Sequence, residues 1–394
     1  MGWGPYVIEQ WRFGEYITLR KNPNYFRAAE GLPRFDRLVF RFVGEDSPTN
    51  ISSLLSSECD LVDQAANLNN AIPQLLALED EGQLRAHITT GTLWEHLVFS
   101  LGHADYDDGY QPGGDRPDLF GDPRTRQAIA LCLDRRRIVD ELLSGLSDVP
   151  RTYVPADHPL FNPRAASYPF SPEEGSRLLE EVGWIDHDGD PNTPRVARGV
   201  PNVPAGTPLA FGYWTTESPL RQQVGPLISA SLAQCGVEAR LQLWKAADFF
   251  ELPDSPLFTR RFDLVEYALT TRTQPLCELF LSENIPGDPQ AQNPDGKPSF
   301  PYGWEGQNTS GYRSAEFDQA CRAALEFLPG QPGYVENHLL AQEIFARDLP
   351  AIPLFQRLLV TATSARLCGY RMDPTALSDT WGIEGYGVGD ECGG

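Results

Sequence analysis

The sequence predicts an α/β protein of two lobes, and three observations lead to this fold class. The chain has 394 residues, more than the roughly 100–200 of a usual single domain. Strand-like and helix-like segments alternate along it, as strand–helix–strand units require. A connection rich in Gly, Asp and Pro, residues 102–118, separates two such stretches. We therefore expect two α/β lobes in sequence.

The first stretch predicts short strands and helices from alternating polarity and turn residues. The turn RFGE joins two alternating segments, YVIEQW and YITLRKN, into a hairpin. Asp46 or Ser47 can cap a helix that has Pro48 in its first turn. The predicted strands are 6–11, 16–22, 35–43, 61–62, 84–88 and 93–101, and the predicted helices begin near 46 and near 71.

The second stretch predicts longer helices between strands. Ser171 caps one helix, with Glu174 three residues later and Pro172 at the first helical position. Spaced apolar residues in 122–145 indicate two consecutive helices that end at Gly145. Further predicted helices are 220–234, 315–328 and 334–347, and the predicted strands are 209–214, 237–243, 262–269 and 352–361.

Composition excludes some classes of partner. The formal net charge is −22, from 54 acidic and 32 basic residues, so a nucleic acid or an anionic membrane would repel the chain. The longest apolar runs, such as LVFSL and IPLF, are far shorter than the about 20 residues of a membrane span. No basic start and apolar stretch, typical of an export signal, follows Met1.

Two features of the sequence suggest a metal site, but neither fits one well. In WIDHDGDPNTP, Asp186, Asp188 and Asp190 alternate as in a calcium loop, yet Ala197 stands where a bidentate glutamate is needed. We favour a solvated Asp-Gly turn. The seven cysteines include no C-x-x-C pair, which argues against zinc, and one or two disulfides remain open.

Catalytic residues are not expected, because the sequence has neither G-x-S-x-G nor H-E-x-x-H. One alternative remains, a hydrolase-like enzyme that uses His96 with an acid. In TLWEHLVFSL, His96 and Trp94 lie on one strand face and Glu95 on the other. The other interpretation of His96 is a satisfied polar residue at a lobe boundary.

Several segments, in order, resemble the family 5 extracellular solute-binding proteins, the peptide, dipeptide and nickel receptors of ABC importers. GPYVIEQWRFGEYITLRKNPNYF resembles the first block of the family, and the similarity continues through SSECDLVD, DPRTRQAIALCLDRRRIVDELLSG and YPFSPEEGSRLLEEVGW. SASLAQCGVEARLQ, RFDLVEY, NTSGYRSAEFDQA and IFARDLPAIPLF follow. The resemblance covers nearly the whole chain, from Gly4 to about Pro374.

The resemblance implies a two-lobed, type II periplasmic-binding-protein-like fold with an incomplete first lobe. Residues 1–97 would be part of lobe I, 98–365 lobe III, and 366–394 a return to lobe I and a tail. The family has more chain before the G-P-Y block, so we expect a fragment, or a non-functional truncated remnant. The full-length protein would be periplasmic or extracellular and membrane-anchored, although no export signal is present here.

The resemblance also implies a function without catalysis or cofactor. Such a receptor, expected to be a monomer, would capture a peptide or similar polar organic solute in a cleft between its lobes and deliver it to a membrane permease. In this family the strand ending in FDLVEYALTTRT faces the cleft, and peptide receptors often carry an aspartate there. Here Leu269, Thr270, Thr271 and Arg272 occupy that stretch without a carboxylate. Hydroxyls and a guanidinium suit a carboxylate, a polyol or backbone carbonyls.

Aromatic side chains are the other expected contacts, because they supply most of the contact area in such pockets. A disulfide between Cys277 and Cys321 is expected beside the pocket strand, and Cys132, on an apolar helix face, is expected to be a free thiol. The remaining candidate ligand-binding residues are Trp94, His96, Tyr213, Trp214, Trp304, Asn308 and Tyr312.

Overall fold

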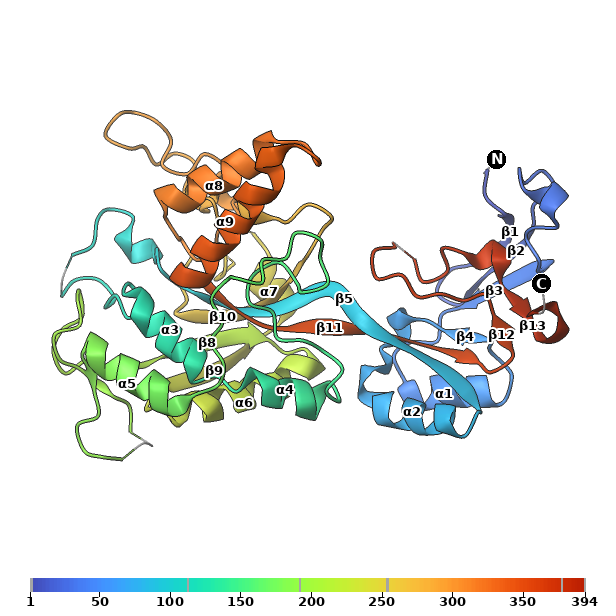
Figure 1. The fold of residues 1–394 in the computed structure, drawn as a ribbon, viewed down its shortest axis with the longest axis horizontal. Helices are drawn as coiled ribbons and strands as arrows, with labels where there is room; N and C mark the ends of the chain where they lie inside the picture. Colours follow the sequence, from blue (N-terminus) through green and yellow to red (C-terminus); the bar gives the residue numbers. More distant parts are fainter. Residues whose placement is uncertain (1–2, 112, 191–192, 253–254, 377, 393–394) are drawn as a thin grey trace. The chain divides into compact units, whose positions relative to one another are not determined.

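The computed structural model describes residues 3–111, 113–190, 193–252, 255–376 and 378–392 (Figure 1). The chain divides into two compact units, which we call unit 1 (Met1–Gly91 and Leu358–Gly394) and unit 2 (Thr92–Arg357). Both boundaries fall inside strands, β5 (Leu84–Phe99) and β11 (Ala351–Ser364). The sequence, by comparison, placed lobe boundaries after residues 97 and 365.

Unit 1 is built around a three-stranded antiparallel meander. The predicted hairpin is confirmed, with Tyr6 opposite Lys21 and Arg12 opposite Tyr16 across the turn. A short strand, β4, pairs with the end of β11. The elements of unit 1 are β1 (Tyr6–Arg12), β2 (Tyr16–Lys21), β3 (Arg37–Arg41), α1 (Ser47–Leu55), β4 (Leu61–Val62), α2 (Ile72–Asp80), β12 (Leu367–Cys368) and β13 (Gly387–Val388).

The strands expected at 84–88 and 93–101 form one 16-residue strand, β5. The expected break fell on Thr89-Thr90-Gly91-Thr92. Three of these residues are β-branched and favour extended backbone, and a single glycine in a strand weakens it without ending it. The two predicted strands are therefore corrected to one, which carries the chain from unit 1 into unit 2.

Unit 2 is a sheet covered by helices on both faces (Figure 1). The strand order of the whole sheet is β4-β11-β5-β10-β8-β9. The strands β8, β9 and β10 are parallel, and β10 pairs antiparallel with β5. The strands first named here are β6 (Trp184–Ile185), β7 (Val196–Ala197), β8 (Ala210–Thr216), β9 (Glu238–Trp244) and β10 (Leu264–Thr270).

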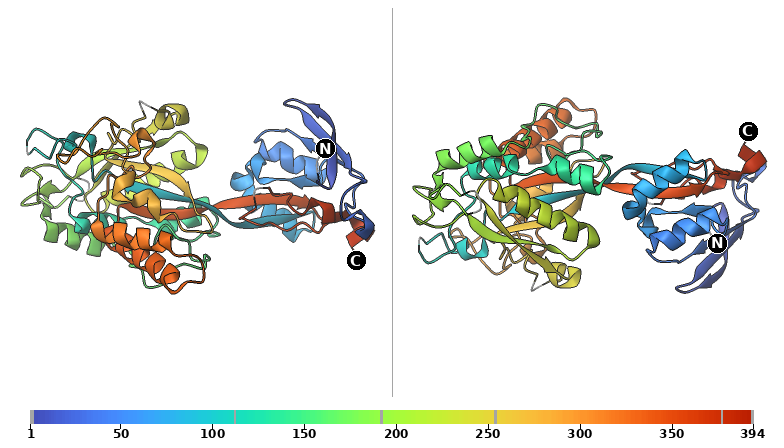
Figure 2. Two further views of the ribbon diagram at one scale, coloured as in Figure 1. Left: turned by 90° about the horizontal axis from the view of Figure 1, so that it is seen from above. Right: turned by 90° about the horizontal axis from the view of Figure 1, so that it is seen from below.

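Alternation along the strands sends one set of side chains to each helical layer. The helices α3 to α6 cover one face, and α8 and α9, which lie side by side in Figures 1 and 2, cover the other. Phe317, Cys321 and Phe345 from α8 and α9 pack against Val98 and Val265 of the sheet. The helices of unit 2 are α3 (Pro123–Leu131), α4 (Arg135–Leu142), α5 (Pro172–Val182), α6 (Pro219–Ala233), α7 (Ala246–Phe250), α8 (Ala315–Glu326) and α9 (Pro332–Asp348). None of the helices in the described ranges has the length and apolar character of a membrane span.

A cluster of charged side chains is buried in this sheet, which we call the buried charge network. Its centre is Glu95 of β5, whose carboxylate is fully buried. Arg221 of α6 lies 3.2 Å from this carboxylate, and Arg357 of β11 donates to it from 2.6 Å. Arg221 also donates to Thr216 at the end of β8. One carboxylate thus joins a helix to two strands of the sheet.

A second buried carboxyl, that of Glu266 on β10, completes the network. It accepts a hydrogen bond from the Tyr213 hydroxyl of β8, while its other oxygen has no partner among the described residues. Burial and the nearby charge of Glu95 raise the pKa of Glu266 to about 8. The raised pKa favours the protonated form of Glu266, and both arginines of the network pair with Glu95 instead.

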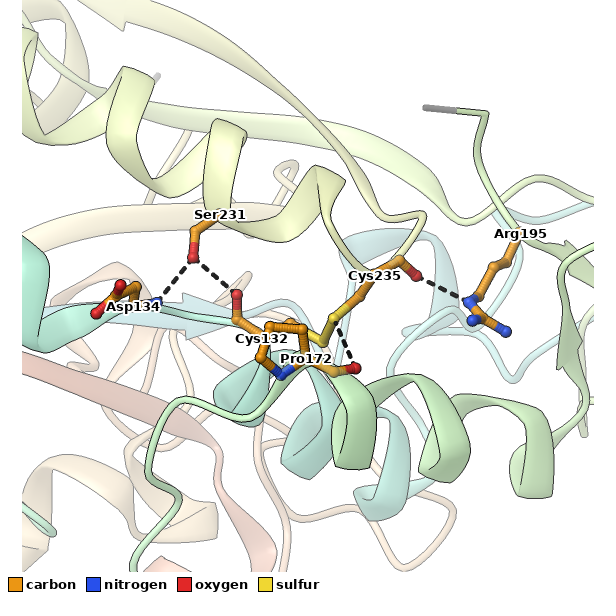
Figure 3. Close-up of a disulfide and its surroundings, with 6 residues drawn as sticks. All are labelled: Cys132, Asp134, Pro172, Arg195, Ser231 and Cys235. Carbon is orange, nitrogen blue, oxygen red and sulfur yellow. Dashed lines mark hydrogen bonds between the residues drawn. A yellow bond between two sulfur atoms is a disulfide. The ribbon is translucent and has the colours of Figure 1, made fainter. Parts of the chain in front are cut away.

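Three disulfides close loops in the chain. The expected pair, Cys277 and Cys321, is joined, and so are Cys132–Cys235 and Cys368–Cys392. The expectation that Cys132 is a free thiol is wrong, because Cys235 meets it at the ends of α3 and α6 (Figure 3). An apolar helix face can carry either a free thiol or a disulfide-bonded cysteine, so the position of Cys132 does not distinguish the two. Its partner is 103 residues away in the sequence. Cys59 is the cysteine left free.

Hydrogen bonds hold the backbone on both sides of the Cys132–Cys235 disulfide (Figure 3). Ser231 of α6 donates to the Cys132 carbonyl over 2.9 Å and accepts the Asp134 amide over 2.8 Å. Arg195 donates to the Cys235 carbonyl over 2.8 Å. The carbonyls of both bonded cysteines therefore have hydrogen-bond partners.

Replacing both Cys132 and Cys235 by serine should lower the free energy of unfolding by about 2–5 kcal/mol, because a long loop is released in the unfolded chain. Urea denaturation measures the change. Cys59→Ser is the matched control and should change it by about 0.5 kcal/mol or less. A double variant as stable as the native chain would contradict the structural role of this disulfide.

Glu95→Gln should destabilise unit 2 by about 3–5 kcal/mol, because two arginines lose their shared counter-ion. The measurement is again urea denaturation at neutral pH. Glu238→Gln, at an exposed ion pair with Arg240, is the control and should change stability by about 0.5 kcal/mol or less. Equal changes in stability for Glu95→Gln and Glu238→Gln would contradict the structural role of Glu95.

Glu266 should make stability fall as pH rises from about 5 to about 8. The unfolded carboxyl ionises near its ordinary pKa of 4.5, whereas the folded one keeps its proton up to about 8. The folded state therefore binds more protons in this window, and its stability decreases with pH. Glu266→Gln should flatten that part of the stability–pH curve, and parallel curves for the two proteins would contradict the prediction.

Candidate functional site

The parallel strands β8, β9 and β10 end at the same edge of the unit 2 sheet, which we call the carboxyl edge. Their last residues are Thr216, Trp244 and Thr270. In open α/β sheets, ligands bind outside the carboxyl ends of the strands. Here the ends of β8 and β9 face each other, with Thr216 opposite Trp244, while Trp214 lies opposite Val265 of β10. The carboxyl edge is therefore the candidate functional site.

Two tryptophans form the apolar part of the carboxyl edge. The rings of Trp214 and Trp244 lie 5.3 Å apart, and both side chains are half-buried against the core under α8 and α9. The indole nitrogen of Trp244 is buried and, within the described part of the chain, has no hydrogen-bond partner. A buried N–H without a partner is costly and is often satisfied by a bound molecule or water. The edge thus combines two neighbouring tryptophan rings with a buried donor that has no partner in the described part of the chain.

The polar part of the carboxyl edge is the turn that follows β10. The Thr271 amide donates to the Thr92 carbonyl over 2.7 Å, and the His158 imidazole lies 3.2 and 3.1 Å from the carbonyls of Arg272 and Thr273. These contacts fix the backbone of the turn at residues 271–273. The Thr271 hydroxyl is buried and has no partner among the described residues. Thr270 and Arg272 are exposed, so the turn presents hydroxyls and a guanidinium to solvent.

Behind the edge, three rings pack together on the face of the sheet that lies under α8 and α9, one pair tilted and the other edge-to-face. His96 lies 4.6 Å from Trp94 and 4.4 Å from Tyr267, measured between ring centroids. Trp94 is opposite Leu269 across the β5–β10 pair. His96 is fully buried, and burial is the main reason that its pKa falls to about 3. A neutral imidazole enclosed by rings gives no support to the hydrolase alternative.

The structure does not bring all the predicted site residues to this edge. Tyr213 points to the opposite face of the sheet, where it donates to Glu266. Asn308 is buried, and its amide donates to the carbonyls of Phe280, Leu281 and Tyr312. Tyr312 donates to Asp348 near the other end of the sheet. Trp304 lies half-buried in a short turn of the same loop.

Trp244 and Phe250 belong to the carboxyl edge but were not among the predicted residues. Trp244 is the last residue of β9, and Phe250, in α7, contacts Tyr267 with ring centroids 6.4 Å apart. The predicted strand 237–243 stopped one residue short of Trp244. Its position at the end of a strand parallel to β8 was the signal that could have identified it.

The loop with Asp186, Asp188 and Asp190 is a hydrogen-bonded turn in its described part. Asp186 accepts the Gly189 amide over 2.8 Å, and Asp188 accepts the Asp190 amide over 3.0 Å and the Thr193 hydroxyl. These bonds lower the pKa of Asp188. The residues described, which leave out 191–192, contain no group of three or more His, Cys, Asp or Glu side chains suited to a metal ion.

Comparison with known sequences identifies the protein family. Residues 1–273 match the model of the bacterial extracellular solute-binding proteins, family 5 Middle. The oligopeptide-binding protein AppA of Bacillus subtilis is 23% identical over 390 residues, which are 98% of this chain and 61% of that protein. Di/tripeptide-binding protein 2 of Pseudomonas aeruginosa is 23% identical over 385 residues, 96% of this chain and 60% of that protein. The chain spans about 60% of the length of these relatives.

Solved structures share the fold. AppA from Bacillus subtilis in complex with a nonapeptide has a TM-score of 0.66 and 18% identity, covering 98% of this chain and 66% of that one. The oligopeptide-binding protein of Thermus thermophilus, complexed with a pentapeptide, has a TM-score of 0.67 and 23% identity, covering 98% and 62%. The expected periplasmic-binding-protein-like α/β fold is therefore confirmed. On the match to the family model, which spans more than half of its residues, the chain belongs to the bacterial extracellular solute-binding proteins of family 5.

Proposed function

We propose that this chain binds a small polar organic solute, a peptide or a molecule of similar size, at the carboxyl edge of unit 2. The observation that carries the proposal is the pair of buried donors without partners among the described residues, the Trp244 indole nitrogen and the Thr271 hydroxyl, on an edge that also exposes Arg272. Membership of a solute-binding family supports it. The names of the two relatives, both peptide-binding proteins, favour a peptide.

The chemistry of the edge favours a ligand group that accepts hydrogen bonds. Thr270 to Arg272 supply hydroxyls and a guanidinium, and none of these side chains is a carboxylate. A guanidinium donates two parallel hydrogen bonds to a carboxylate, and the two tryptophans offer flat apolar surface to the rest of the solute. We infer that the end of the solute that contacts Arg272 is a carboxylate or a carbonyl, rather than a free amine.

We further propose that the protein works in the periplasm or outside the cell as the receptor of an ABC importer. Three disulfides suit an oxidising compartment. A binding protein of this kind acts without catalysis, as a monomer that passes its solute to a membrane permease. A permease reads the conformation that the bound solute favours, and a solute shifts a conformation only by its differential affinity.

Arg272→Ala should weaken binding of a peptide with a free carboxyl terminus roughly 10–100-fold, the range for a hydrogen bond to a charged group. Isothermal titration calorimetry measures this on the whole chain, with a peptide chosen from a thermal-shift screen. The same peptide with an amidated carboxyl terminus should bind the native protein more weakly and be insensitive to Arg272→Ala. Acetylation of its amino terminus should change little.

Thr271→Val keeps the shape of the side chain and removes the hydroxyl, so binding should weaken roughly 2–10-fold while stability is unchanged. Arg198→Ala, at an exposed arginine elsewhere in unit 2, is the matched control and should bind like the native chain. If Arg272→Ala and Thr271→Val both bind the peptide as tightly as the control does, the solute does not bind at the carboxyl edge.

A further inference from the structure

A cavity of about 560 Å³ lies within unit 2, away from the carboxyl edge. Leu101 and Gly102, just after β5, Arg260, just before β10, and Asp348, just before β11, all contribute to its wall. The carboxyl edge lies at the opposite end of β10, a strand of seven residues or about 20 Å. The cavity is therefore a separate feature, and its volume is within the range of small-molecule sites.

The wall of this cavity carries a net positive charge, although the chain is acidic. Three arginines line it, Arg126, Arg260 and Arg313, against two aspartates, Asp107 and Asp348. The protein as a whole carries a formal charge of −22. An excess of guanidinium groups in a concave wall raises the local concentration of anions, because low-dielectric walls focus the field.

Two of the arginines are fixed by the protein itself. Arg126 is almost fully buried and donates only to backbone carbonyls, those of Phe120, Gly121, Asp348 and Leu349. Arg260 is 2% exposed and donates to the Pro286 carbonyl over 2.8 Å and to Asp107 over 2.5 Å. Its guanidinium also lies 5.1 Å from the centre of the Phe300 ring. These contacts fix the positions of the Arg126 and Arg260 guanidinium groups in the cavity wall.

The two aspartates of the wall are already engaged. Asp107 pairs with Arg260, and its side chain is 36% exposed. Asp348 accepts the Tyr312 hydroxyl over 2.6 Å and pairs with Arg347 outside the cavity over 2.8 Å. Neither aspartate forms an ion pair with Arg313. The carboxylates in the wall therefore do not neutralise this arginine directly.

Arg313 is the group that remains available. It is exposed, and it forms no hydrogen bond and no ion pair with any described residue. Burial of part of its side chain, followed by the nearby charge of Arg260, lowers its pKa. The charges of Asp107 and Asp318 act in the opposite direction on this pKa. An anion bound beside Arg313 would add to their favourable effect on the guanidinium charge.

The backbone next to Arg313 is rigid. Gly311 has a φ of +67°, and a Cβ placed on it would lie 2.6 Å from the Cα of Gly102. Both glycines line the cavity, so two backbone segments meet there without side chains between them. The Leu101 and Gly102 amides both donate to the Ser310 carbonyl, over 2.8 and 2.9 Å. The segment that carries Arg313 is thus pinned to the end of β5.

We propose that this cavity is a second binding site, for a small molecule that carries one carboxylate or phosphate group, with Arg313 as its principal ligand-binding residue. The oxyanion would receive hydrogen bonds from the free guanidinium of Arg313, beside the fixed charge of Arg260. The shared chemistry is that of a compact oxyanion, and the two possible sources, carboxylate and phosphate, are separated by the experiment.

The test is isothermal titration calorimetry of the whole chain with inorganic phosphate and, separately, with succinate, at constant ionic strength balanced with chloride. At least one of the two anions should bind at one site per chain, and the tighter one identifies the source. Arg313→Ala should weaken that binding tenfold or more, whereas Arg313→Lys, which keeps the charge, should lose less. Thermal unfolding should be the same for the native chain and Arg313→Ala, because Arg313 has no partner among the described residues.

Arg198→Ala, an exposed arginine outside the cavity, and Arg272→Ala at the carboxyl edge are the controls, and both should bind the anion like the native chain. The proposal is overturned if neither anion gives a saturable signal, or if Arg198→Ala loses as much binding as Arg313→Ala. Loss with Arg272→Ala alone would assign the anion to the carboxyl edge, so this result also counts against a second site.

Discussion

The sheet of unit 2 depends on one carboxylate, that of Glu95, which is buried with two arginines around it. An isolated charge in a protein interior is unfavourable by many kcal/mol, so such a group persists only where partners surround it. Arg221 reaches it from α6 and Arg357 from β11, which ties a helix and two strands to one point. At Glu266, burial and the charge of Glu95 raise the pKa, which favours the uncharged form of that carboxyl. The network thus fixes where α6 and β11 lie on the sheet that carries the candidate site.

The buried charge network also positions part of the carboxyl edge. Arg221 also donates to Thr216, the last residue of β8, so the network reaches the end of a strand that borders the site. The other side of the sheet is occupied by the packed rings of Trp94, His96 and Tyr267 under α8 and α9. Side chains therefore cover both faces of the sheet, and the candidate site lies where the parallel strands end, with Thr270 and Arg272 exposed. That arrangement suits binding, because the contact groups stand on rigid elements.

Much of the fold was predictable from the sequence, because the signals for it are local. Alternation and turn residues identified the hairpin of β1 and β2, and the helix predicted after Ser171 is α5. The predicted cap is wrong in its detail, because the Ser171 side chain makes no capping hydrogen bond. The break expected near Gly91 was wrong, because β-branched neighbours outweigh one glycine. The pairing of Cys132 with Cys235 was not predictable, since the two are far apart in sequence and each suits an apolar surface as a free thiol.

The candidate site was only partly predictable, because a sequence shows which residues end a strand but not what each side chain meets. Thr270 to Arg272 were named because the family resemblance implies that this strand end faces a cleft; the polar strand end alone did not identify them. Tyr213 was grouped with Trp214, although neighbouring residues of a strand point to opposite faces. Glu95 and Glu266, each set in an apolar run, were the visible signs of a buried network that only the tertiary structure assembles.

The central claim, that a polar organic solute binds at the carboxyl edge, is tested most directly by hydrogen–deuterium exchange of the whole chain with and without a saturating peptide. The account predicts slower exchange of the backbone amides at residues 270–273 and around Trp214 and Trp244, with little change in unit 1 strands β1 to β3. A peptide that saturates the protein, as shown by calorimetry, yet leaves exchange at these residues unchanged would contradict the account.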